Sequence, residues 1–147
     1  MSDDGTDCCQ WTRRQTALLA ERRWDQLDVE RLTEEVRSLG DEQAHAIESH
    51  LRNLLRHLLK GRYQPTRRSP SWRRSINNAR GGEIAPRLRR NPSLRRQLEV
   101  YLAWQYPVAR RMAADETGLP LDTFTESCLW AVERVLEPGF WPEGRGA

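Results

Sequence analysis

The sequence predicts an all-α fold, a compact bundle of about five to six helices that run mostly antiparallel to one another. Apolar residues recur at three- and four-residue intervals along most of the chain, and no segment of convincing length alternates with the two-residue period of a strand. Proline and glycine separate the periodic segments, which favours short connections. We expect one helical domain over residues 1–147, with an ordered core at about 8–140 and flexible ends at 1–7 and 143–147.

Two helices are expected in the first part of the chain. The first runs from about Trp11 to Arg23. Asp28 is a good N-cap for the second, because its carboxylate can accept a hydrogen bond from a first-turn N–H. Gly40 suits the position just after a helix, and Asp41 can cap the helix that follows. The second helix carries a narrow apolar stripe, made of Val29, Leu32, Val36 and Leu39.

The clearest helix is expected at about residues 41–62. Its apolar residues form one broad face, which predicts the main buried surface of the bundle. The residue before a proline disfavours the helical conformation, so Gln64-Pro65 ends this helix. The broad face consists of Ala44, Ile47, Leu51, Leu54, Leu55 and Leu58.

Pairs of a capping residue and a proline mark the starts of two later helices. Ser69-Pro70 opens a helix that runs through Arg80. Gly81-Gly82 and Pro86 follow, and we expect a break or a kink there. Asn91-Pro92 repeats the signature and opens the second of these helices.

The helix that follows Asn91-Pro92 contains Pro107, which predicts a kink, and it ends at Gly118. A short last helix is expected at about residues 126–136, stopped by Glu137-Pro138-Gly139. The connections on both sides are short, as in an antiparallel bundle.

Charge is distributed very unevenly along the chain. The overall formal charge is +3, but residues 1–50 carry −6, residues 51–100 carry +12 and residues 101–147 carry −3. The basic residues are almost all arginines, and Lys60 is the single lysine. The position of this charge is therefore more informative than its chemical type.

A series of short motifs runs in order along most of the chain, at about residues 11–140. They are Trp11, Asp28-x-x-x-Leu32-x-x-Glu35, Ser38-Leu39-Gly40, His57-Leu58-Leu59-Lys60, Gln64-Pro65, Ser71-Trp72, Pro92-Ser93-Leu94, Tyr106, Ala109-Arg110, Glu116-Thr117-Gly118-Leu119, and Phe124 before Cys128. Together they resemble the bacterial "domain of unknown function 29" family. The resemblance implies an all-helical fold, and it supplies neither an activity nor catalytic residues. This chain departs from the family pattern at Leu129, where a proline is usual, and at Gly81-Gly82, in a segment that is usually a good helix former.

The sequence shows little that predicts catalysis. His50 and His57 are two helical turns apart, about 10.5 Å along the axis, which is too far for one metal ion. The chain has no nucleophile elbow and no glycine-rich phosphate loop. Its three cysteines lack metal-finger spacing. We therefore expect no metal and no cofactor, and the sequence favours a role other than that of an enzyme.

The basic segment, residues 62–96, is the best functional lead. Arginines interleaved with aromatic residues can bind phosphates and stack on bases, which supports nucleic-acid binding as one hypothesis. Pairing of these arginines with the acidic N-terminal helices is the alternative, and the sequence does not decide between the two. The residues predicted for surface recognition are Arg67, Arg68, Arg73, Arg74, Arg89, Arg90, Arg95 and Arg96.

The turn after the third helix is predicted to be structural. Trp72 is spaced with Ile76 and Ala79, which favours packing in the core over stacking on a base. The amide of Gln64 is expected to satisfy backbone groups freed near Pro65. The residues assigned to this turn are His57, Lys60, Gln64, Pro65 and Trp72.

The favoured function is a macromolecule-binding module, with a protein partner or self-association preferred over nucleic acid. Six tryptophans are many for a chain of this length, and any that stay exposed would anchor an interface. No apolar run approaches the ~20 residues that span a bilayer, and the first residues do not resemble a signal peptide. We therefore expect a cytoplasmic protein that does not enter the membrane.

Overall fold

The computed structural model describes residues 7–143. These residues form an all-α fold without strands, which confirms the predicted fold class. The α-helices are α1 (Cys8–Ala20), α2 (Val29–Tyr63), α3 (Pro70–Asn77), α4 (Ala85–Arg90), α5 (Leu98–Thr117) and α6 (Val132–Leu136). Short 3-10 turns connect several of them, and a π-helical segment, η3 (Asn78–Ile84), joins α3 to α4.

The described residues belong to two compact units, which divide between Asp41 and Glu42, inside α2. The expectation of a single domain over residues 1–147 stays a prediction. The expected flexible ends lie outside the described residues, except for two positions. Asp7 caps α1 and accepts a hydrogen bond from the Gln10 amide at 2.9 Å, and Glu143 is exposed.

The first unit is organised around Asp28. Its backbone N–H donates to the Gln15 side chain at 2.9 Å, and its carboxylate accepts from the Trp11 indole at 3.2 Å. The same carboxylate accepts from the amide of Arg31 at 3.2 Å, which confirms Asp28 as the cap of α2. Trp11, Gln15 and Leu18 are buried. Because Asp7 caps α1, that helix begins at Cys8, three residues before the predicted start.

The predicted helix end at Gly40 is wrong, because α2 continues through this position from Val29 to Tyr63. Asp41 therefore lies inside the helix and does not cap a new one. A glycine within a helix costs only about 1 kcal/mol relative to alanine, so the residues on either side can keep the helix intact. Glycine ends a helix when it adopts a positive φ, and Gly40 does not.

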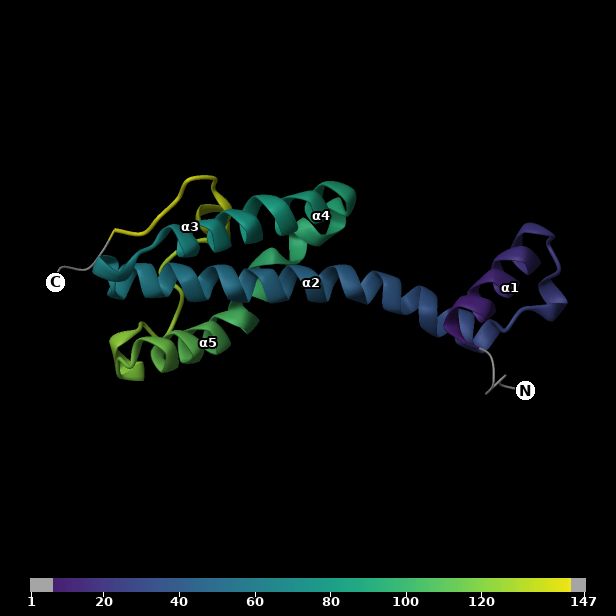
Figure 1. Cartoon of the computed structure of the whole chain (residues 1–147), viewed down its shortest axis with the longest axis horizontal. Coiled ribbons are helices and arrows are strands. Elements are labelled where there is room, and N and C mark those ends of the chain that lie inside the picture. Colours follow the sequence, from purple (N-terminus) through teal and green to yellow (C-terminus); the bar gives the residue numbers. More distant parts are fainter. Residues whose placement is uncertain (1–6, 144–147) are drawn as a thin grey trace. The chain divides into compact units, whose positions relative to one another are not determined.

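The second unit holds the main hydrophobic core. Figure 1 shows the second half of α2 with α3 and α4 along one side and α5 along another. The predicted broad face of α2 is buried there, since Ile47, Leu51, Leu54, Leu55 and Leu58 have no exposed surface. These side chains meet core residues from the other elements, among them Ile76, Ile84, Leu88, Tyr106, Ala109, Phe124, Val132 and Val135.

The break expected at Gly81-Gly82 is a π-helical segment. The helix widens over Asn78–Ile84 and then continues as α4, so the two glycines alter the helix without ending it. A Cβ added to Gly82 would lie only 2.9 Å from the side-chain oxygen of Asn78. Pro86 lies in the first turn of α4, where a missing N–H costs little.

The last elements differ from the prediction at their starts. Asn91-Pro92 opens a 3-10 segment, η4 (Pro92–Gln97), and α5 begins only at Leu98. The predicted end of α5 is confirmed, since Gly118 has a φ of 73° and donates its N–H to the Ala114 carbonyl at 2.9 Å. α6 begins at Val132, several residues later than expected.

Candidate functional site

The residues assigned to the turn after α2 lie together. The Lys60 ammonium is 4.7 Å from the centre of the Trp72 ring. The centres of the His57 and Trp72 rings are 6.5 Å apart. Trp72 is half-buried. Pro65 opens the 3-10 turn η2 (Pro65–Arg67). These contacts give Trp72 a packing role, in a cation–π contact with Lys60.

The expected partner of Gln64 is wrong. Its side-chain amide donates to the carbonyl of Thr117 at 3.2 Å, and this carbonyl belongs to the last turn of α5. Carbonyls in the last turn of a helix have no partner within the helix, so Gln64 satisfies one of them. The amide thus links the C-terminal ends of α2 and α5, and does not cap its own turn.

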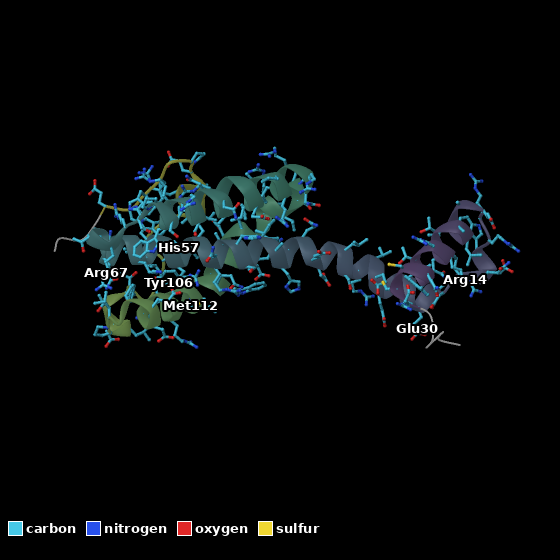
Figure 2. The ribbon with its side chains drawn as sticks, in the orientation of Figure 1. Arg14, Glu30, His57, Arg67, Tyr106 and Met112 are labelled. Carbon is cyan, nitrogen blue, oxygen red and sulfur yellow. The ribbon has the colours of Figure 1, made fainter. Side chains whose placement is uncertain are left out.

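His57 is buried along α2, whereas Arg67 lies beyond the end of that helix (Figure 2). Burial, together with the positive charges of Arg56 and Lys60, lowers the pKa of His57 from 6.5 to about 4. Its Nδ1 atom has no hydrogen-bond partner. His57 is therefore neutral near pH 7, and the nearest basic groups disfavour its protonation.

The structure brings no metal-binding cluster together within residues 7–143, where no group of three His, Cys, Asp or Glu residues lies close enough. The imidazole of His50 instead contacts the carboxylate of Glu83 at 3.3 Å, and Glu83 also pairs with Arg87. Cys8 and Cys9 are exposed free thiols, and Cys128 is a half-buried one.

Most of the arginines predicted for recognition reach the solvent. Apart from Arg68, each has an exposed side chain that forms no hydrogen bond or ion pair with any residue of 42–143. No aspartate or glutamate of residues 42–143 pairs with these side chains. These exposed arginines are Arg67, Arg73, Arg74, Arg89, Arg90, Arg95 and Arg96.

Arg68 has a different environment from the other seven. It is half-buried and donates from Nε to the carbonyl of Gly61 at 2.9 Å. A terminal nitrogen donates to the carbonyl of Pro142, and the guanidinium lies 4.8 Å from the centre of the Trp141 ring. Arg68 therefore ties the C-terminal segment to the end of α2. Burial lowers the pKa of its guanidinium.

Arg80 is a buried arginine to which the sequence patterns gave no separate role. Only 5% of it is exposed, and it donates to the carbonyls of Val135 and Phe140, at 3.0 Å each. Burial lowers the pKa of Arg80, and the negative charge of Glu137 partly opposes this shift. Arg80 lies one helical turn after Ile76, on the same side of the helix. This spacing could have predicted that Arg80 is buried.

A hollow of about 640 Å³ lies beside α3. Its lining contains no aspartate or glutamate, and a smaller hollow of about 250 Å³ shares Arg73, Asn77 and Trp141 with it. Arg80 lines the smaller one. The two hollows together form a basic groove. The larger one is lined by Arg68, Ser69, Pro70, Arg73, Arg74, Asn77 and Trp141.

One face of α5 is apolar and uncovered. Trp104 is 61% exposed, with Val100 at 39% and Val108 at 41%, one helical turn away on either side. Ala103 and Pro107, which lie on the neighbouring part of the same face, are also exposed. This five-residue surface is named the α5 apolar face below. Pro107 has no N–H to donate to the Ala103 carbonyl, so that carbonyl is left without its helical partner.

A comparison with protein-family profiles matches residues 5–141 to the family described as "Domain of unknown function DUF29". The chain belongs to this family. The resemblance predicted from the ordered motifs is thereby confirmed, and the description names no activity for DUF29 members. No curated protein and no solved structure matches the chain. Within the described residues of this DUF29 chain, no helix has both the length and the apolar character that crossing a membrane requires.

Proposed function

We propose that this chain is a protein-interaction module and that the α5 apolar face is its docking surface, with a second copy of the chain as the occupant. The observation that carries the proposal is the exposure of Trp104 between two exposed valines. Tryptophan is the residue type most enriched among interface anchors. Burying the exposed part of this ring, on the order of 100 Å², favours association by about 2–3 kcal/mol per copy.

The spacing on α5 fits a partner that carries the same face. Val100 and Val108 lie four residues before and four residues after Trp104. In an antiparallel pair of α5 helices related by a two-fold axis at Trp104, each Val100 meets the Val108 of the other copy. Such an interface is self-complementary, as two-fold interfaces require.

The charges at the two ends of α5 favour the same antiparallel arrangement. Arg95 and Arg96, just before the helix, are exposed and form no ion pair within the described residues. Asp115, in the last turns, is also exposed. An antiparallel pair brings Arg95 and Arg96 of one copy near Asp115 of the other, at an end of α5 that also carries the exposed Arg111, whereas a parallel pair places like charges together.

We also propose that this interaction takes place in the cytoplasm. The free thiols Cys8, Cys9 and Cys128 support a reducing compartment, where cysteines do not form disulfides.

Sedimentation equilibrium of the full chain over a range of concentrations tests the proposal. The wild type is expected to form dimers, and Trp104→Ala is expected to weaken them by about tenfold or more, since central interface anchors contribute 2 kcal/mol or more. Trp24→Ala is the matched control, because Trp24 is 58% exposed but lies in the first unit. A monomeric wild type at all concentrations, or equal weakening by both variants, would overturn the proposal.

A charge exchange separates antiparallel pairing from general stickiness. Asp115→Arg alone and Arg96→Glu alone are each expected to weaken the dimer, because each places like charges together. Combining the two substitutions in one chain restores opposite charges, and dimer formation is expected to recover. Failure of the combined variant to recover would contradict the antiparallel arrangement.

A further inference from the structure

We propose that the basic groove beside α3 binds the phosphate groups of a small organic polyphosphate, of the size of a nucleoside diphosphate or triphosphate. The site involves none of the residues of the α5 apolar face. The inference therefore goes beyond the proposed function and does not depend on it.

The charge of the groove indicates an anionic ligand. The side chains of Arg73 and Arg74 on α3 are exposed, and neither forms a hydrogen bond or an ion pair with a residue of 42–143. No carboxylate lines the larger hollow, so nothing in its wall neutralises the guanidinium groups. Guanidinium groups pair with phosphate through two parallel hydrogen bonds, which makes phosphate the best matched anion.

Two further arginines hold fixed positive charge at the groove. Arg68 and Arg80 donate to backbone carbonyls, which are neutral, so each keeps its full positive charge. Arg80 is almost completely buried, it forms no ion pair with Glu137, whose negative charge acts on it, and burying a charge is costly. The lowered pKa values of both residues reflect this burial. A bound phosphate near the groove would offset part of that cost.

Neutral groups in the wall complete the site. Asn77 lines both hollows, and its side chain forms no hydrogen bond with a described residue. The Ser69 hydroxyl accepts from the Trp72 amide at 3.2 Å and keeps its own proton free to donate. Ser69 and Pro70 stand at the start of α3, where the helix dipole is positive. Pro70 and Trp141 add apolar surface for the organic part of the ligand.

The size of the hollow separates a small ligand from a nucleic acid. Its volume of about 640 Å³ lies within the range of roughly 300–1,000 Å³ that is usual for small-molecule sites. Nucleic-acid binding would instead recruit exposed arginines spread along the whole basic segment, including Arg89 and Arg90, which do not line the groove.

Isothermal titration calorimetry of the full chain with pyrophosphate, ATP and AMP tests the inference at low and near-physiological salt. ATP and pyrophosphate are expected to bind more tightly than AMP, because they offer more phosphate oxygens to the arginines. The double variant Arg73→Ala/Arg74→Ala is expected to weaken ATP binding by about tenfold or more. Both positions are exposed and unpaired, and thermal unfolding checks that the variant keeps its fold.

Arg89→Ala/Arg90→Ala is the matched control, since it removes the same charge from exposed positions outside the groove. ATP binding that is unchanged in this control and weakened in the groove variant supports the site. Equal weakening in both variants would show general attraction to a basic protein and would overturn it. Absence of ATP and pyrophosphate binding by the wild type at low salt would also overturn it. Tight binding of a labelled DNA duplex without ATP binding would also overturn the polyphosphate site and would support nucleic-acid binding instead.

Discussion

The two halves of α2 carry apolar residues at helical spacing, yet they meet different surroundings. In the first half, Val29, Val36 and Leu39 are 62%, 65% and 64% exposed. In the second half, Ile47 and Leu55 have no exposed surface, and the same is true of Leu51, Leu54 and Leu58. The boundary between the two compact units falls between these halves, although the helix itself is continuous.

The difference teaches that an apolar stripe predicts a helix more reliably than it predicts burial. A narrow stripe offers too little surface to compete for partners, whereas the broad face of the second half is covered by α3, α4, α5 and the C-terminal segment. Backbone hydrogen bonds maintain the helix in both halves, because they are local and do not require a packing partner.

Truncating a buried leucine in the second half of α2 is expected to lower the free energy of unfolding more than any other change described below. Leu55→Ala removes a fully buried side chain and is expected to lower the free energy of unfolding by about 2–5 kcal/mol, through lost burial and a new cavity. Leu39→Ala makes the same chemical change in the exposed half, and its effect is expected to stay within about 0.5 kcal/mol. Urea unfolding followed by circular dichroism measures both. Similar effects of the two substitutions would show that the exposed stripe is covered in solution.

Protonation of His57 probes the buried half separately. In the unfolded chain this histidine takes up a proton below about pH 6.5, whereas in the folded state it stays neutral down to about pH 4. The unfolded state therefore binds more protons between these values. The stabilisation is complete above pH 6.5 and is lost as the pH falls toward 4, by up to about 3 kcal/mol.

Urea unfolding of the wild type and of His57→Gln between pH 7 and pH 4.5 measures this loss. The variant lacks the titrating group and is expected to lose less stability over the same interval. His45→Gln removes an exposed histidine from the same helix and is expected to follow the wild type. The idea fails if His57→Gln and the wild type lose equal stability as the pH falls.

The smallest expected effects on stability come from two glycines of α2, one in each half of the helix. A Cβ added to Gly40 meets nothing within 4 Å, so Gly40→Ala is expected to stabilise the protein by about 0.5–1 kcal/mol. A Cβ added to Gly61 lies 3.1 Å and 3.3 Å from two ring carbons of Trp141. Gly61→Ala is therefore expected to destabilise by about 1 kcal/mol, as the ring has to shift. Thermal unfolding compares the two, and effects of the same sign would contradict the different environments.

The candidate binding surfaces were only partly predictable. Arg73 and Arg74 were selected from the density of charge, and the structure places both at the groove. The six tryptophans predicted that some would stay exposed as interface anchors, but the exposure of Trp104 depended on where α5 packs. The contribution of Trp141 could not be predicted, because its position depends on contacts of the C-terminal segment with Arg68 and Gly61.

The sequence by itself determined the helical class, the family, the capping of α2 by Asp28, the end of α5 at Gly118 and the separation of charge along the chain. The helical class and the two helix ends follow from residues close to one another in the chain, and the family and the charge separation follow from the order of residues along it. The tertiary structure alone decided which apolar stripe is buried and which arginines serve as internal ties. Arg68 and Arg80 find carbonyl partners 74 and 55 residues away, and local pattern carries no information about such distant partners. Burial depends on the surfaces that meet a residue, and only the folded chain brings those surfaces together.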